Sequence, residues 1–394
     1  MKVLIVFHDR GFGGIQVHCL TLMEGLVRHG DDVTFCGPFD GWLAEQCRQR
    51  GIPVEACAFR GLYDVRAHLS LARAVRRLDV DIVHGHGRRS SFYGAIAARL
   101  AGIPSVSTAH STHAWKQLHW NTRVIAVSGA VHDSLVARGV PAERIATVRH
   151  GIPGPDGDAT ALRATWRRYL GLSGKDVAVV MAARFVRDKG QDVAVEALAR
   201  LGRSLRNVRL LLLGHASGPW FGHVSRLAEA RGLGDHVRFM GYRDDVARLL
   251  PAMDICIMPS RREALSISIL EASAASVPTI GSRVGGIPEV VSDGETGLLF
   301  SCADADELAA CMRLLIEDRT QRRRLGRNAR VRFAEHFTLA RMVSETRAAY
   351  MQAASRMRAG GVGVATVPDS RGEADAIPAA NGYRSARSGG RRLP

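Results

Sequence analysis

The chain has 394 residues, of which 46% are hydrophobic, and it carries a formal net charge of +16. This length is enough for two domains with a core each, and the composition is that of a globular protein. No apolar run reaches the roughly eighteen residues of a membrane-spanning helix. The N-terminal segment 1–9 meets charge after one apolar run and shows no small-residue cleavage site, so we expect no signal peptide.

Arginine dominates the 54 basic residues. Such an excess favours an anionic partner, either lipid or nucleic acid. We do not expect nucleic acid, because the chain has no basic motif interleaved with aromatic residues. The seven cysteines are an odd number without a C-x-x-C pair, which is typical of free thiols in a reducing compartment. We therefore expect a cytoplasmic protein that can also bind the inner face of an anionic membrane.

The first 150 residues alternate short apolar runs with helical patterns, which predicts a parallel sheet with crossover helices. The strands are expected at 3–7, 33–36, 82–83, 106–108 and 124–127, and the clearest helices at 15–29 and 94–100. Between the first strand and its helix lies the turn Gly11-Phe12-Gly13-Gly14. It is no dinucleotide fingerprint, because Gln16 takes the third glycine position and no acid closes the second strand. A flexible turn that lets a substrate approach the backbone is the alternative interpretation.

Three histidines lie at the ends of predicted strands. His84 and His86 are two residues apart in an extended run and therefore point the same way. They could be half of a metal site, but no third ligand is evident, so we interpret them as loop-end packing and expect no metal. His110 follows the strand 106–108, at the carboxyl edge where open α/β sheets bind ligands.

Residues 151–158 are rich in Gly, Pro and Asp and predict a linker between two α/β domains, 1–150 and 159–339. The second domain opens with a strand at 177–182 that leads into Arg184 and Lys189. An arginine can fork onto a phosphate, and a lysine binds another phosphate oxygen as a point charge. The alternative is a solvated charged turn. Further strands are expected at 209–213 and 237–240.

The stretch 254–300 organises the second domain. The apolar run 254–259 predicts a buried strand, and a helix is expected from Ser266, with Ile267, Leu270 and Ala274 on its buried face. Free N–H groups and the positive dipole end at Leu265, Ser266 and Ile267 would attract phosphate. Two carboxylates, Glu263 and Glu271, are suited to sugar or ribose hydroxyls. Together these groups indicate a nucleotide-sugar ligand.

Two glutamates with seven residues between them precede Pro278-Thr279-Ile280-Gly281 and Gly285-Gly286-Ile287-Pro288-Glu289. This run resembles the motif of retaining GT-B glycosyltransferases of family four, also described as glycosyl transferases group 1. The resemblance extends over roughly 1–355, most strongly over 180–300. It implies an α/β fold of the GT-B type, in which two Rossmann-like domains face each other across a cleft. It also implies a hexosyltransferase-type activity that needs no metal ion or other cofactor.

The resemblance assigns a role to each matching residue. Gly13 and Gly14 would lie beneath the donor phosphates, Arg184 and Lys189 would hold the pyrophosphate, and the loop at Tyr242 would lie near the base. Glu271 would hold the ribose hydroxyls, Glu263 a hydroxyl of the donor sugar, and His110 the sugar itself. At the hinge, His150 stands where family members usually carry Asn.

The implied reaction transfers a sugar from a nucleotide-diphosphate sugar to a hydroxyl acceptor, with retention at the anomeric carbon. The acceptor is expected to be a lipid-linked or cell-surface glycan, as in lipopolysaccharide or exopolysaccharide assembly. The basic, aromatic segments 88–93 and 113–116 would suit such an anionic acceptor. A soluble acceptor is the alternative.

Two D-x-D spacings, Asp79/Asp81 and Asp304/Asp306, are interpreted as structural, because the first precedes a buried strand and the second a helix that aspartate can cap. The helix expected at 340–358 resembles one that crosses back to the first domain. The basic tail 359–394 has little apolar content and is predicted to be disordered.

Two other functions fit the same fold. A GT-B nucleotide-sugar epimerase shares the architecture but should lack the paired-glutamate run. A catalytically silent GT-B protein would bind a nucleotide sugar as a partner or regulator, and the intact Arg184, Lys189, Glu263 and Glu271 argue against it.

Overall fold

The computed structural model describes residues 1–59, 61–113 and 116–359. All of them belong to one compact unit, Met1–Gly361. The predicted tail lies outside the described residues, apart from residue 359. None of the described helices is long and apolar enough to cross a bilayer.

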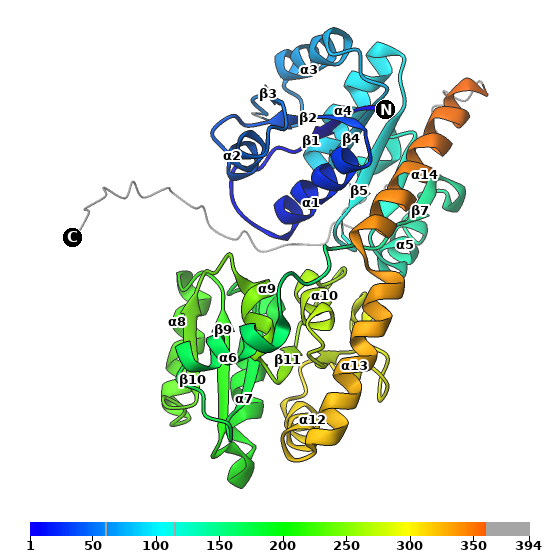
Figure 1. Cartoon of the computed structure of the whole chain (residues 1–394). Helices are drawn as coiled ribbons and strands as arrows, with labels where there is room; N and C mark the ends of the chain where they lie inside the picture. Colours follow the sequence, from blue (N-terminus) through cyan, green and yellow to red (C-terminus); the bar gives the residue numbers. More distant parts are fainter. Residues whose placement is uncertain (60, 114–115, 360–394) are drawn as a thin grey trace, which may run out of the picture. The chain divides into compact units, whose positions relative to one another are not determined.

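The first half of the chain forms a seven-stranded, wholly parallel sheet in the order β3-β2-β1-β4-β5-β6-β7 (Figure 1). Its strands are β1 (Lys2–Val6), β2 (Asp32–Gly37), β3 (Val54–Ala56), β4 (Ile82–His86), β5 (Ser105–Ala109), β6 (Arg123–Ala126) and β7 (Ile145–Thr147). The five predicted strands are present. The edge strands β3 and β7 were not predicted, because each has three residues and neither is wholly buried.

Helices follow the strands of this sheet as crossover connections, as expected for parallel neighbours. They are α1 (Gly14–Arg28), α2 (Trp42–Gln49), α3 (Val65–Arg77), α4 (Arg88–Ala101) and α5 (Gly129–Val136), with 3-10 turns at Leu118–Trp120 and Ala142–Arg144. Helix α4 begins six residues before the predicted start at residue 94. Ser90 to Tyr93 are buried in it, so the aromatic part of segment 88–93 packs inside the protein and is not an acceptor surface.

The second half forms a six-stranded parallel sheet in the order β10-β9-β8-β11-β12-β13. Its strands are β8 (Val177–Ala182), β9 (Val208–Leu213), β10 (Val237–Gly241), β11 (Ile255–Met258), β12 (Thr279–Ser282) and β13 (Gly297–Phe300). The helices are α6 (Ala159–Tyr169), α7 (Gln191–Ala199), α8 (Gly218–Ala230), α9 (Val246–Leu249), α10 (Ile267–Ala274), α11 (Ile287–Val290), α12 (Ala305–Glu317), α13 (Arg319–His336) and α14 (Leu339–Arg358), with 3-10 turns at Arg187–Lys189, Gly202–Leu205 and Leu250–Ala252. Two parallel α/β sheets confirm the predicted fold class.

Each sheet reverses its strand order at one point, between β1 and β4 in the first and between β8 and β11 in the second. Open α/β sheets bind ligands beyond the carboxyl ends of the strands at such a point. The glycine turn follows β1, and His86 ends β4. Arg184 and Lys189 follow β8, and Glu263 follows β11. The topology therefore brings most predicted site residues to the two switch points.

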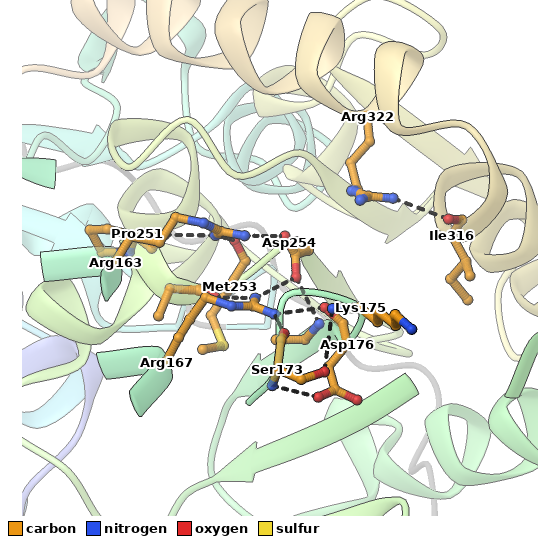
Figure 2. A network of polar contacts seen from close by, with 12 residues as sticks. Arg163, Arg167, Ser173, Lys175, Asp176, Pro251, Met253, Asp254, Ile316 and Arg322 are labelled. Carbon is orange, nitrogen blue, oxygen red and sulfur yellow. Dashed lines mark hydrogen bonds and ion pairs between the residues drawn. The ribbon is translucent and has the colours of Figure 1, made fainter. Parts of the chain in front are cut away.

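A polar network closes the opposite, amino-terminal edge of the second sheet (Figure 2). The carboxylate of Asp254, just before β11, accepts three hydrogen bonds. They come from Arg163 at 2.7 Å, from Arg167 at 3.0 Å and from the Ala178 N–H at 2.9 Å. Arg167 also donates to carbonyls of the loop before β8, at Ser173 and Asp176. These bonds tie α6 to the start of β8 and β11.

Helix α14 packs on the first half of the chain, beside α1 and the strands β5 and β6 (Figure 1). Its buried residues Met342, Val343 and Tyr350 share a core with β1 and α1. The Tyr350 hydroxyl lies 2.7 Å from Nδ1 of His84. The last helix is thus held by one buried polar contact as well as by apolar packing.

Candidate functional site

A cavity of about 530 Å³ lies where the two switch points meet. Of the predicted site residues, it is lined by Gly14, His110, Arg184, Lys189, Glu263, Leu265, Ser266 and Ile267. Gly13, Tyr242 and Glu271 do not line it. The lining thus combines cations and a helix N-terminus from the second half with a glycine and a histidine from the first.

Lys189 and Glu263 form an ion pair inside the cavity. The Lys189 ammonium donates to a Glu263 carboxylate oxygen at 2.6 Å, and the exposed side-chain fractions are 21% and 9%. The Ser260 hydroxyl donates to the same oxygen at 3.4 Å. The backbone carbonyl of Arg184 accepts from the Gln191 amide at 2.7 Å, which holds the start of this loop. The cation and carboxylate predicted to contact the donor therefore contact each other here.

Two glycines let the site loops approach each other closely. Gly190 has φ +75°, and a Cβ there would lie 2.0 Å from the Pro259 carbonyl oxygen at the end of β11. Gly285 has φ +50°, and a Cβ there would lie 1.7 Å from the carbonyl oxygen of Glu263. Both positions need glycine for conformation and for space. The glycines of the motif thus set the position of the Glu263 loop.

Helix α10 directs its N-terminus at the cavity. The helix begins at Ile267, one residue after the predicted start, with Ser266 as its N-cap, and the Ser266 side chain makes no capping bond. The first-turn N–H groups can therefore serve an anion. Leu270 and Ala274 are buried as predicted, but Ile267 is only half-buried and lines the cavity. The buried side of the first turn is carried by Ile269 instead.

Glu271 lies one turn into α10 and outside the cavity lining. Burial raises its pKa from the ordinary 4.5 to about 7. The carboxyl group is thus largely protonated below neutral pH and can accept hydrogen bonds fully only above it.

An aromatic row connects the glycine turn with the loop after β10. Phe12 contacts Trp42 at a ring-centroid distance of 4.9 Å and Tyr242 at 4.7 Å. Tyr242 stacks on His215 at 4.8 Å. Phe12 and Tyr242 are both more than a third exposed. A base bound near Tyr242 would meet aromatic faces as well as backbone.

The histidine prediction was incomplete. His84 and His86 do lie on the same side of β4, with ring centroids 4.2 Å apart. His86 Nδ1 lies 3.1 Å from His110 Nε2, and His150 Nδ1 lies 2.8 Å from His18 Nδ1. Burial lowers the pKa of His84 to about 3 and of His150 to about 4, and it also lowers the pKa of His18, His86 and His110. No local pattern in the sequence marks His18, because it lies far along the chain from the other four histidines and meets them only in the folded protein.

Glu289, at the end of the motif, contacts the first half of the chain. One carboxylate oxygen accepts from the Ala130 N–H at 3.2 Å, in the first turn of α5. The other accepts from the Arg149 side chain at 2.9 Å. Sequence reasoning gave this residue no role, because its partners are more than a hundred positions away.

The remaining predictions have mixed outcomes. Asp304 accepts from two N–H groups in the first turn of α12, so the second D-x-D is a helix cap as predicted. Asp79 and Asp81 both bind Lys2. His113 lines the cavity, whereas residues 114 and 115 of the second basic, aromatic segment lie outside the described residues.

Two family models match the chain. The model described as Glycosyl transferases group 1 matches residues 163–332, and the model described as Glycosyltransferase Family 4 matches residues 12–153. These ranges correspond to the two sheets.

Curated relatives match along most of the chain. An alpha-maltose-1-phosphate synthase of Mycolicibacterium smegmatis is 32% identical, over 85% of this chain and 94% of the relative. A D-inositol 3-phosphate glycosyltransferase of Corynebacterium diphtheriae is 25% identical, over 87% of this chain and 90% of the relative.

Solved structures share the fold. The Anabaena protein HepE in complex with UDP and glucose superposes with a TM-score of 0.78 at 22% identity, covering 88% of this chain and 98% of HepE. A glycosyltransferase from Rickettsia africae gives a TM-score of 0.80 at 20% identity, covering 89% and 98% of the two chains. The two parallel sheets are thus arranged as in GT-B glycosyltransferases.

Fold and relatives together define a glycosyltransferase of the GT-B class. Within this class, the chain belongs to the glycosyl transferases group 1 family.

Proposed function

We propose that this protein is a retaining hexosyltransferase that moves a sugar from a nucleotide-diphosphate sugar to a hydroxyl acceptor. The observation that carries the proposal is the meeting of Arg184, Lys189 and the free N-terminus of α10 in one cavity. Solved relatives hold UDP or UDP-glucose, which supports a nucleotide-sugar donor.

The chemical task is to stabilise the negative charge that grows on the leaving phosphate. Preorganised cations and N–H groups do this in a site that excludes water. Arg184 would fork onto the pyrophosphate, and Lys189 would exchange Glu263 for a phosphate oxygen. Glu263, once released from Lys189, would accept a hydrogen bond from a hydroxyl of the donor sugar. His110 would contact the sugar from the side of the cavity that the first half of the chain forms. We propose that these groups act without a metal ion on the pyrophosphate.

Retention would follow from attack on the face that the phosphate leaves, with a phosphate oxygen accepting the proton of the acceptor hydroxyl. This hypothesis follows the resemblance to the family. Proton NMR of the first-formed product tests it through the anomeric configuration. An inverted product, or a trapped covalent glycosyl-enzyme, would contradict it.

For the acceptor, we propose a lipid-linked or cell-surface glycan, reached by a protein on the inner face of the cytoplasmic membrane. The net charge of +16 supports binding of the protein to an anionic membrane surface. The relatives named for inositol 3-phosphate and maltose 1-phosphate favour a second candidate, a small phosphorylated acceptor. Cosedimentation with anionic vesicles, followed by transfer assays with each acceptor class, separates the two.

The donor test is a panel of UDP-, GDP- and ADP-sugars, scored by nucleoside diphosphate release. We expect release from one donor, and a loss of about ten- to a thousandfold in turnover in Lys189→Ala. Lys175→Ala, which removes an exposed lysine of the same domain, is the matched control. Added Mg²⁺ or Mn²⁺ should not raise the rate.

Donor-dependent thermal stabilisation without release, even with acceptors present, would favour a silent nucleotide-sugar-binding protein. An altered sugar with no acceptor consumed would favour an epimerase. The proposed reaction would be overturned if no donor gave either nucleoside diphosphate release or thermal stabilisation.

A further inference from the structure

Five histidines from four separate segments cluster together, and two of them, His110 and His150, line the cavity. His18 lies on α1, His84 and His86 on β4, His110 after β5 and His150 before the linker. Four of the five are at least nine-tenths buried, and His110 is half-buried. Neighbouring rings lie between 4.2 and 5.6 Å apart, from centroid to centroid.

His84 is fully accounted for by the fold. Its Nδ1 lies 2.7 Å from the Tyr350 hydroxyl, and its Nε2 lies 2.7 Å from the Thr108 hydroxyl. Both nitrogens are therefore used, and His84 supplies a matched comparison for its neighbours.

The other buried imidazoles have nitrogens without a partner. His18 Nε2, His86 Nε2 and His110 Nδ1 are buried and lack a hydrogen-bond partner among the described residues. Each neutral imidazole has one N–H and one lone pair. One hydrogen must therefore lie between His86 Nδ1 and His110 Nε2, and either ring can carry it. Hydrogen bonding alone leaves the tautomers of this pair undefined.

The cluster also matches the needs of a transition metal, through His18 Nε2 and through the two nitrogens that face each other, His86 Nδ1 and His110 Nε2. One ring nitrogen from each of His18, His86 and His110 lies within 4.8 Å of the others. The 3.1 Å between His86 Nδ1 and His110 Nε2 is close to the edge of about 3.4 Å expected for two imidazoles on a tetrahedral ion at about 2.1 Å. The nitrogen of His18 lies within 4.8 Å of the other two and would have to come closer to complete the same geometry.

We propose that His18 Nε2, His86 Nδ1 and His110 Nε2 form a binding site for a divalent transition metal of the zinc class. Three imidazoles favour zinc, copper or nickel over magnesium and calcium. His18 Nδ1–H would then donate to His150 Nδ1 at 2.8 Å, so His150 acts as an outer-shell residue that orients the ligand ring.

The site uses neither of the pyrophosphate cations, although it shares His110 with the proposed sugar contact, and its binding test does not rest on the proposed reaction. Its ligands come from the first half of the chain, whereas Arg184 and Lys189 come from the second. Metal binding would place the hydrogen of His110 on Nδ1 and so fix one tautomer of a cavity-lining residue. A fourth coordination position would remain for an oxygen ligand.

Binding can be measured without turnover. The full chain, purified without a histidine tag, is stripped with a chelator and incubated with Zn²⁺ or Co²⁺. We expect about one metal per chain by elemental mass spectrometry and the intense visible absorption of tetrahedral Co²⁺. Zn²⁺ should also raise the melting temperature.

The variants separate ligands from neighbours. His86→Gln and His18→Gln should each abolish the Co²⁺ spectrum, and His150→Gln should weaken Zn²⁺ affinity by about 10- to 100-fold. His84→Gln, equally buried but not a ligand, should keep the spectrum. Circular dichroism checks folding, and either ligand variant suffices if the other does not fold.

The proposal is overturned if the stripped wild type takes up neither ion, which would leave buried water as the partner of these nitrogens. Equal binding by wild type, His18→Gln and His86→Gln would also overturn it, because the ion would then lie elsewhere. If the wild type bound the metal but transferred no sugar, the result would count against the proposed function and not against the metal site.

Discussion

At the residue scale, the cavity is sensitive to a single methyl group at Gly14. This residue lines the cavity, and a Cβ built there meets no atom within 4 Å. Gly14→Ala should therefore fold normally but occupy space that the donor needs. We expect the donor KM to rise by about 10- to 200-fold, the range for one methyl group in a binding pocket. Gly234→Ala, which also meets no atom within 4 Å, should leave both KM and melting temperature unchanged.

The carboxyl of Glu271 predicts a pH dependence of donor binding. Its folded pKa of about 7 lies above the ordinary 4.5, so the folded protein holds a proton that the unfolded chain releases. The free energy of unfolding should thus fall as pH rises from about 4.5 to about 7. Ribose hydroxyls need the ionised form as acceptor, so donor affinity should rise through the same pH range.

Isothermal titration of the donor against pH measures this effect. In Glu271→Gln the pH dependence between 4.5 and 7 should disappear from both donor affinity and stability. A pH profile that is unchanged in the variant would assign the titration to another group.

Some site residues could be predicted from local spacing and others could not. Arg184 and Lys189 lie five positions apart after one strand, so their sequence spacing already places them at one sheet edge. His18 meets His150, and Glu289 meets Ala130, only because the whole fold brings them together. No residue-type pattern within a short window carries such contacts.

At the scale of elements, the hydrogen bond between α14 and β4 should contribute measurably to stability. Tyr350 is fully buried, and its hydroxyl meets His84 at 2.7 Å. Tyr350→Phe keeps the ring but leaves a buried imidazole nitrogen without a partner. We expect a loss of about 1–3 kcal/mol in the free energy of unfolding by urea denaturation.

The control is Tyr63→Phe, which removes a hydroxyl from a side chain that is 80% exposed and should change stability little. If the Tyr350 variant were as stable as wild type, a water molecule would have to replace the hydroxyl.

The motif glycine Gly285 should be intolerant of any side chain. Its positive φ and the 1.7 Å approach to the Glu263 carbonyl oxygen mean that an added Cβ must displace the loop. Gly285→Ala should lower turnover about a hundredfold, because a shift of about 1 Å in a positioning group has that effect. Gly294→Ala, at φ +74° but with open space around it, is the control for backbone strain alone.

Strands and helices with strong periodicity were predicted from the sequence, and those hidden by composition were not. Strands β12 and β13 lie inside the motif region, where glycine and proline mask their short apolar runs. Helix α4 begins with Arg88-Arg89-Ser90-Ser91, which has no apolar spacing to mark a first turn. Tertiary packing determines these elements more than local propensity does.

At the scale of the whole molecule, Glu289 connects the two halves of the chain. Its carboxylate adds to the Ser128 cap of α5 by accepting from the Ala130 N–H. Its other partner, Arg149, has a side chain 42% exposed, so that ion pair adds little. Glu289→Ala should lower the free energy of unfolding by about 1–2 kcal/mol, mainly through the lost hydrogen bond to the Ala130 N–H. Glu295→Ala, an exposed glutamate of the same region, is the control, and urea denaturation is the measurement.

The Lys189–Glu263 ion pair has a consequence for product release. A carboxylate fixed 2.6 Å from the ammonium is a tethered anion with a high effective concentration. Any phosphate that binds Lys189 must displace the Glu263 carboxylate. Nucleoside diphosphate without its sugar therefore gains less binding free energy than the intact donor, because the donor also offers Glu263 a hydroxyl. After transfer, the carboxylate competes with the spent nucleotide for the same lysine. The resting ion pair would thus limit product inhibition and favour turnover.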